Sequence, residues 1–135
     1  MSDEALPTLA TARLVLRPFR LEDAPTVQRL AGVREVAATT LTVPHPYPDG
    51  EAEAWIATHA GAWAERKVLT LAVTLREDGA LVGAVGLALV MADRRAELGY
   101  WIGVPWWNRG FATEASRALV DFGFGQVSAL GHPAE

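Results

Sequence analysis

The residues of this chain best suited to chemistry are Asn108, Arg109 and Gly110, which form a turn between an apolar stretch and an amphipathic helix. After the turn, apolar residues recur at positions i, i+3, i+4 and i+7 and so form one helix face: Ala115, Ala118, Leu119 and Phe122. The first N–H groups of a helix lack intrahelical partners, and the helix dipole adds about half a positive charge at that end. The turn therefore leads into a helix start with free donors.

Such a helix start favours a phosphate or diphosphate, because its free N–H groups can bind the anionic oxygens. Gly110 lets a ligand approach the backbone closely, and Arg109 adds a formal positive charge. The turn is therefore predicted to bind an anion. The alternative is a structural turn in which Gly110 only provides a positive φ angle.

Hydrophobic periodicity indicates the elements that would position this turn. Residues 1–10 are expected to be a loose lead-in and residues 127–135 an irregular tail, with one domain over 11–126 between them. Three consecutive strands joined by short turns favour an antiparallel meander over a βαβ unit. The predicted order is β-α-α-β-β-β-α, with strands over 12–19, 68–75, 81–91 and 95–103, and helices between Asp23 and Gly32, over 49–66 and from Ala112 onward.

Composition excludes several classes of protein and site. The 135 residues suit a single domain with a modest core. The net charge of −4 gives no reason to expect a nucleic-acid or membrane partner. The absence of cysteine excludes disulfides, thiolate metal sites and cysteine nucleophiles, and three scattered histidines make no metal set. With no signal-like N-terminus and no apolar run of about 20 residues, the protein is expected to be cytoplasmic.

The turn also resembles a known family. Trp107-Asn108-Arg109-Gly110-Phe111-Ala112 is similar to the Arg/Gln-x-x-Gly-x-Gly/Ala acetyl-CoA motif of the GNAT acetyltransferase superfamily, with Trp107 at the first motif position. The runs 97–103 and 107–115, together with the opening 13–19, resemble the RimJ/RimL branch. The characterised members of that branch acetylate protein N-termini.

The resemblance implies an α/β (α+β) fold with a mixed, mostly antiparallel twisted sheet and helices on both faces. A family member would continue with a fifth strand parallel to the fourth, another helix and two more strands. Residues 125–135 are too short to supply these elements. We therefore expect a C-terminally truncated GNAT-like domain in which the strand 97–103 is a sheet edge.

The resemblance also implies where acetyl-CoA would bind. A bulge would leave the backbone of Ile102, Gly103 and Val104 free to bind the pantetheine arm and polarise the thioester carbonyl. Trp107 is assigned to the same site, and of Trp106 and Trp107 one is expected to pack under the helix and the other to line the groove. The diphosphate cradle would comprise Asn108, Arg109, Gly110, Phe111, Ala112 and Thr113.

Glu97 matches the acidic residue of the family's strand and is the candidate general base, because the attacking amine must lose a proton. The alternative for Glu97 is an ion pair with Arg94, Arg95 or Arg17. His45 and Tyr47 lie in a proline-rich loop at which related enzymes shape the acceptor pocket. The alternative for that pair is a solvated loop.

Two other polar residues are expected to have structural roles. Glu114, in the first helical turn, would offset the helix dipole. His59 is four residues from both Trp55 and Trp63, so packing on a helix face is favoured over ligand binding. No general acid is assigned.

The leading hypothesis is an N-acetyltransferase that moves an acetyl group from acetyl-CoA directly to a primary amine, either a protein N-terminus or a small-molecule amine. The absence of cysteine forbids an acetyl-cysteine intermediate and agrees with direct attack. The first alternative is a catalytically impaired, truncated module that binds CoA or a partner, with a homodimer formed through the exposed strand edge. The second alternative is an incomplete reading frame.

Overall fold

The computed structural model of the protein describes residues 6–31, 50–90 and 95–129, with side chains described up to Gly123 except that of Val90. The described chain forms one antiparallel sheet in the strand order β1-β2-β3-β4-β5. Each strand therefore pairs with the next one along the sequence. The strands are β1 (Leu9–Ala10), β2 (Leu14–Arg17), β3 (Val68–Leu75), β4 (Leu81–Val90) and β5 (Arg95–Ile102).

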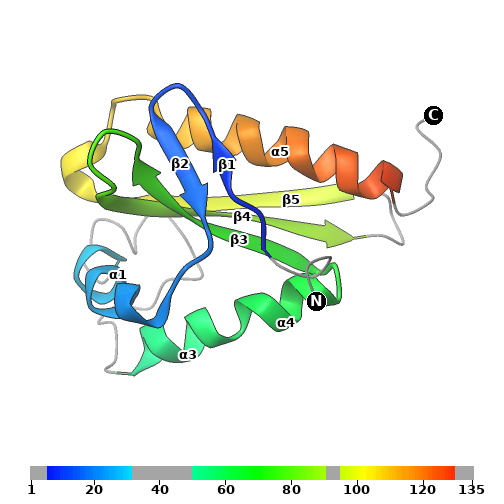
Figure 1. Ribbon diagram of the computed structural model, residues 1–135, viewed down its shortest axis with the longest axis horizontal. Helices are drawn as coiled ribbons and strands as arrows, with labels where there is room; N and C mark the ends of the chain where they lie inside the picture. Colours follow the sequence, from blue (N-terminus) through cyan, green and yellow to red (C-terminus); the bar gives the residue numbers. More distant parts are fainter. Residues whose placement is uncertain (1–5, 32–49, 91–94, 130–135) are drawn as a thin grey trace.

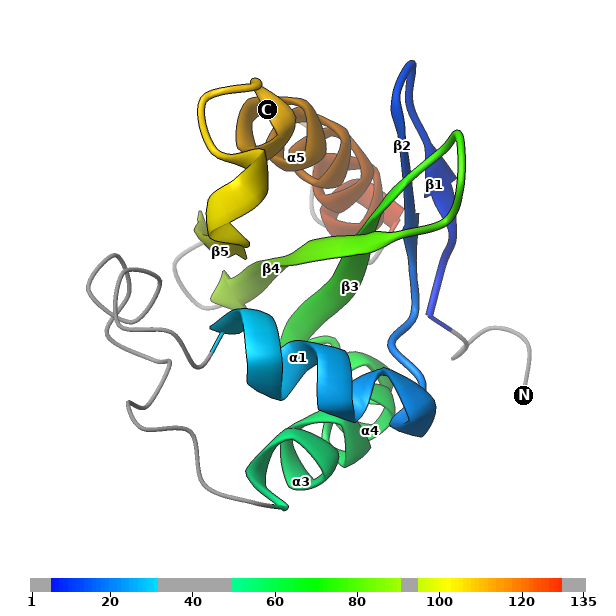
Figure 2. The same cartoon turned by 90° about the vertical axis from the view of Figure 1, so that its left-hand side faces the viewer.

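Helices cover both faces of this sheet. One face carries α5 (Phe111–Ala129), and the other carries α1 (Ala24–Ala31), α3 (Glu51–Ala57) and α4 (His59–Ala64), as Figures 1 and 2 show. Short 3-10 helices, η2 (Leu21–Asp23) and η4 (Val104–Trp106), precede α1 and the turn before α5. This arrangement confirms the predicted fold class.

The side chains of β3 and β4 alternate in size between the two faces, as the period of a strand requires. Toward α5 the sheet presents large apolar residues that pack with Phe111, Ala115 and Leu119, namely Leu69, Leu71, Val73, Val85, Leu87 and Leu89. Toward α1 and α3 it presents small ones, Ala72 and Ala84, beside Trp101. Each helix layer therefore has its own apolar core.

The boundaries differ from the predicted ones in three places. Residues 9–10, expected in the lead-in, form β1, because Thr11 closes a tight hairpin with Leu14: the Thr11 N–H donates to the Leu14 carbonyl at 2.8 Å. The helix expected over 49–66 is interrupted at Thr58, whose side chain donates to the Trp55 carbonyl. Residues 127–129 are helical rather than irregular, because α5 continues through Ala129.

The β5 strand is an edge of the described sheet, as predicted for 97–103. Residues 95–100 are all exposed, and two of them are large and hydrophobic: Leu98 is 43% exposed and Tyr100 is 50% exposed. An edge strand with apolar side chains offers unpaired backbone groups and apolar contacts to a ligand or another chain. The start of α5 lies at the end of this edge.

Candidate functional site

The turn before α5 has the backbone geometry of an anion-binding helix start. Asn108 and Gly110 have positive φ angles, 64° and 79°. The helix begins at Phe111, and the Glu114 N–H makes its first hydrogen bond, to the Gly110 carbonyl at 3.0 Å. The N–H groups of Phe111, Ala112 and Thr113 precede that bond and have no intrahelical acceptor. The predicted entry into a helix N-terminus is therefore confirmed.

A groove of about 570 Å³ joins this helix start to the open edge of β5. Its strand side is Leu98–Ile102, and its other walls are Trp106, Trp107 and Asn108 together with Gly110–Thr113. Most of the predicted cofactor residues thus lie around one groove. Gly103, Val104 and Arg109 do not line it, although Arg109 is exposed beside it in the turn.

Several of the backbone groups that we expected to be free at the end of β5 have partners within the protein. The Gly103 N–H donates to the Val82 carbonyl at 2.8 Å, and the Ile102 carbonyl accepts the indole N–H of Trp107 at 2.6 Å. Antiparallel strands alternate the residues that face their neighbour, so the backbone groups of Leu98 and Tyr100 point to the open edge. The outward polar backbone of β5 therefore extends from Ile102 back to Leu98, beyond the residues that we predicted.

Trp106 and Trp107 do not divide the two predicted roles, in which one would pack under the helix and the other would line the groove. Both line the groove and both are half-buried. The ring of Trp106 packs so closely on Gly103 that a β-carbon there would lie 3.0 Å from the ring. Trp107 connects the turn to the strand through its indole hydrogen bond to Ile102. Together they hold the end of β5 against the turn.

The β1–β2 hairpin reaches the turn from the other side, where the side chain of Glu114 collects three donors. These are the Thr11 hydroxyl at 2.5 Å, the Arg13 backbone N–H at 2.8 Å and the Arg13 Nε at 2.7 Å. Burial alone would raise the pKa of Glu114, but these hydrogen bonds and the charge of Arg13 hold the pKa below its ordinary value. Glu114 is therefore a hydrogen-bonded carboxylate, with a structural role wider than offsetting the helix dipole.

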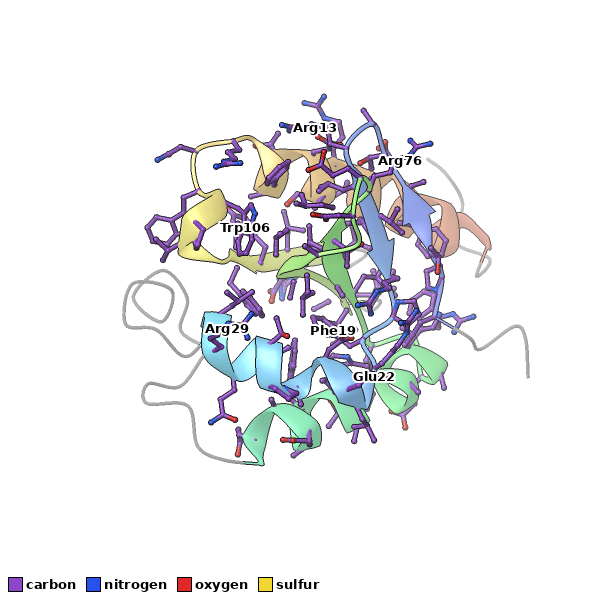
Figure 3. All side chains as sticks on the ribbon, turned by 60° about the vertical axis from the view of Figure 1, so that its left-hand side comes forward. Arg13, Phe19, Glu22, Arg29, Arg76 and Trp106 are labelled. Carbon is purple, nitrogen blue, oxygen red and sulfur yellow. The ribbon has the colours of Figure 1, made fainter. Side chains whose placement is uncertain are left out.

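Arg13 itself spans the turn. Its Nη1 donates to the Arg109 carbonyl at 2.8 Å, and its guanidinium lies 4.6 Å from the centre of the Phe111 ring. Figure 3 shows Arg13 and Arg76 at the same end of the molecule as the start of α5. Thr11 and Arg13 were not predicted as site residues, because their contacts with α5 cross about a hundred residues of sequence.

The other predicted residues lie apart from this groove. Glu97 is exposed on β5, its Oε2 is 3.2 Å from Nη1 of Arg95, and it does not line the groove. The ion pair is one of the alternatives considered for Glu97. His45 and Tyr47 lie outside the described residues.

His59 packs as predicted on the α3–α4 side. It is 5% exposed, and its ring centre lies 4.4 Å from that of Trp55 and 5.5 Å from that of Phe19. Neither ring nitrogen has a hydrogen-bond partner among the described residues. Burial lowers the pKa of His59 from 6.5 to about 4, so the ring is neutral at pH 7.

Neither a metal site nor a membrane span is found in the described ranges. No group of three or more His, Cys, Asp or Glu residues is placed to hold a metal ion in that part of the chain. The helices within the same ranges also include none that combines the length and apolar character needed to span a bilayer.

A family model and a curated relative both match this chain to GNAT-type acetyltransferases. The model of the acetyltransferase (GNAT) domain matches residues 13–131. The uncharacterized N-acetyltransferase YoaA of Bacillus subtilis is 32% identical over 126 residues, which are 93% of this chain and 69% of YoaA.

Solved structures agree with this match. An acetyltransferase from Agrobacterium tumefaciens superposes with a TM-score of 0.73 at 27% identity, over 92% of this chain and 70% of that one. RimL, a ribosomal L7/L12 alpha-N-protein acetyltransferase in complex with coenzyme A, superposes with a TM-score of 0.68 at 13% identity, over 87% and 68% of the two chains. At that identity, RimL supports the fold alone.

Proposed function

Because the chain belongs to the GNAT acetyltransferase family, we propose that it binds acetyl-CoA in the groove between β5 and the start of α5 and transfers the acetyl group directly to a primary amine. One observation carries the proposal: a single groove connects the free N–H groups of the α5 start with the open backbone edge of β5. The two ends suit the two halves of coenzyme A, a charged diphosphate and an amide-containing arm.

The diphosphate would bind at the N–H groups of Phe111, Ala112 and Thr113, where the helix dipole favours negative charge. Gly110 adds no side chain beside these donors, where a β-carbon would lie 3.3 Å from Nη2 of Arg13, and Arg109 adds a cation. The pantetheine amides would pair with the outward backbone groups of Leu98 and Tyr100, as an added strand pairs with a sheet edge. This pose directs the thioester along β5.

The reaction would be direct aminolysis of the thioester. The amine nitrogen attacks the carbonyl carbon, a C–N bond forms, and the C–S bond breaks as the CoA thiolate leaves. The amine loses a proton, and solvent can protonate the thiolate. A backbone N–H at the developing oxyanion would lower the barrier by about 3 kcal/mol, and the β5 edge is the element that offers such donors.

Glu97 is the proposed base, acting through water on the attacking amine. It lies one residue before Leu98, and side chains alternate along a strand, so Glu97 faces the α1 side rather than the groove wall beside α5. Replacing Glu97 with Gln should lower kcat by about 100-fold if the carboxylate accepts the proton. The stability should change by less than about 0.5 kcal/mol, because the pair with Arg95 is solvent-exposed. An unchanged kcat would remove Glu97 from the mechanism.

The acceptor that we propose is an amine of the kind used by the RimJ/RimL branch, a protein N-terminus, with small-molecule amines as the competing class. The resemblance of residues 97–103 and 107–115 to that branch supports this choice. His45 and Tyr47 remain the predicted acceptor residues. A thiol-release assay with N-terminal peptides and a panel of small amines tests the choice. Release of CoA only with small amines would reject the protein N-terminus.

A second candidate is a module that binds CoA without catalysis and dimerises through β5. The exposed Leu98 and Tyr100 on a sheet edge favour it, because proteins normally cover such edges. Calorimetry with acetyl-CoA and the thiol-release assay separate the two candidates. Binding without thiol release above background, together with the mass of a dimer in solution, would favour the second candidate over the enzyme.

A further inference from the structure

The β1–β2 hairpin is joined to the turn and the start of α5 by several hydrogen bonds. Arg13 bonds one group before and one group after Phe111, the first residue of α5. These are the Arg109 carbonyl, through Nη1, and the Glu114 carboxylate, through Nε. The Thr11 hydroxyl and the Arg13 N–H complete the partners of Glu114. We call the pair Arg13 and Glu114, with these bonds, the hairpin clamp.

The turn needs such support because its backbone conformation is unusual. Asn108 and Gly110 both have positive φ angles, with Arg109 between them. Glycine, and occasionally asparagine, adopts the left-handed conformation routinely, so these residue types permit the turn but do not by themselves fix it. Arg13 holds the carbonyl of the residue between them and so restrains the peptide whose N–H belongs to Gly110.

The hairpin clamp also neutralises a negative charge beside the proposed phosphate site. Glu114 lies in the first turn of α5, and its carboxylate would repel a phosphate bound at that helix start. The guanidinium of Arg13 pairs with it at 2.7 Å. The guanidinium reaches the carboxylate and the carbonyl through two separate nitrogen atoms, Nε and Nη1, whereas the three donors of a lysine ammonium all lie on one nitrogen.

We propose that Arg13 is a positioning residue for coenzyme binding: it holds the 108–110 turn so that the N–H groups of 111–113 face the groove, and Glu114 holds Arg13 in place. The proposal rests on the proposed function, since the ligand of those N–H groups is taken to be the coenzyme diphosphate. Arg13 acts through the turn rather than by contact with the ligand.

The test measures the Kd of CoA by calorimetry for the wild type, Arg13→Ala, Arg13→Lys and Arg17→Ala, at a temperature at which circular dichroism shows each variant fully folded. Arg17 is the matched control, because it lies at the other end of β2 and pairs with Asp23 at 2.9 Å. We expect Arg13→Ala to weaken CoA binding by about tenfold, the scale of one lost charge-assisted hydrogen bond. Arg17→Ala should lower the Tm more and leave the Kd unchanged.

Arg13→Lys decides between position and charge, and it also decides the test if Arg13→Ala does not fold. It keeps the positive charge but not the two-sided contact, so binding should remain at least about threefold weaker than in the wild type. Amide hydrogen exchange without ligand gives a second readout: both Arg13 variants should speed exchange at residues 110–114, and Arg17→Ala should not.

The outcomes separate this proposal from the proposed function. A wild type that does not bind CoA would reject the proposed function itself. Wild-type binding with an unchanged Kd in Arg13→Ala, full recovery in Arg13→Lys, or an equal loss in Arg17→Ala would each overturn the positioning role of Arg13. Loss in both Arg13 variants with a normal Kd in Arg17→Ala would support it.

Discussion

Two arginines at the two ends of β2 make the same kind of bond and serve different parts of the molecule. Arg13 pairs with Glu114 at the start of α5, and Arg17 pairs with Asp23 at the end of the 3-10 helix before α1. Figure 3 shows the two ends, with Arg13 near α5 and Phe19, two residues after Arg17, near α1. The pairs differ in burial and in how far along the sequence they reach.

The Arg17–Asp23 pair is local and largely buried. Its side chains are 17% and 12% exposed, and Asp23 also accepts the Arg20 N–H at 2.8 Å. Burial would raise the pKa of Asp23, but the hydrogen bonds from Arg17 and Arg20 and the charges of both arginines lower it below its ordinary value. This pair therefore fixes the route from β2 into α1.

The Arg13–Glu114 pair is distant in sequence and more open. Arg13 is 48% exposed, and the pair joins residues 101 apart in the chain. Glu114 is 18% exposed, but an ion pair whose cation is half-exposed contributes less to stability than a buried one. Two similar ion pairs thus differ in setting: Arg17–Asp23 is largely buried within the α1 side of the fold, and Arg13–Glu114 lies beside the turn that we propose as a binding site.

The largest expected effect is at Gly110. Gly110→Glu places a carboxylate at the mouth of the N–H groups and should weaken CoA binding by more than about 100-fold. Gly79→Glu is the matched control, because Gly79 has a similar φ of 77° in the β3–β4 turn with open space around it. Calorimetry should show normal CoA binding by Gly79→Glu; equal losses in both variants would mean that the helix start is not the binding point.

The next effect separates the two pairs by stability. Asp23→Ala leaves Arg17 largely buried without its carboxylate and should reduce the free energy of unfolding by about 2–3 kcal/mol. Glu114→Ala should reduce it by only about 1 kcal/mol, because Arg13 can be solvated. Urea denaturation measures both. A larger loss for Glu114→Ala than for Asp23→Ala would reverse the assignment of roles.

A smaller effect concerns pH and the α1 side. The pKa of His59 is about 4 in the folded protein and 6.5 ordinarily, so between these values the unfolded chain binds more protons. Stability should therefore fall as the pH drops from 6.5 to 4, by about 3 kcal/mol, and become independent of this group well above 6.5. His59→Leu should flatten that range in pH-dependent unfolding; an unchanged slope would show that His59 is not its source.

The carboxylates of Asp23 and Glu114 titrate at lower pH than His59, so their contribution to stability can be distinguished from that of His59. The pKa values of Asp23 and Glu114 are depressed below 3.8 and 4.5, so their stabilisation is complete above those values and is lost as pH falls further.

The strands and the α5 start could be predicted because their signals are local. The alternation along β3 and the turn at 108–110 with its following helical face are each read within about ten residues. The division of the α3–α4 segment at Thr58 was less visible, because a side-chain bond to Trp55 interrupts an otherwise continuous helical pattern.

The rest of the site depends on contacts between distant segments. Arg13 belongs to the opening run quoted for the family resemblance, yet nothing within that run indicates that it bonds Glu114 and Arg109. The free backbone of Leu98 and Tyr100 depends on the register of β4 and β5, and the bond from Trp107 to Ile102 depends on the path of the turn. Register and long-range pairing are not recorded in local sequence patterns.

An NMR titration of the ¹⁵N-labelled protein with CoA tests whether the α5 start and the β5 edge form the CoA site. We expect the largest amide shifts at Gly110, Phe111, Ala112 and Thr113, with smaller ones at Leu98 and Tyr100, because these residues line the groove. Shifts confined to other segments, with residues 110–113 unchanged at saturating CoA, would contradict it.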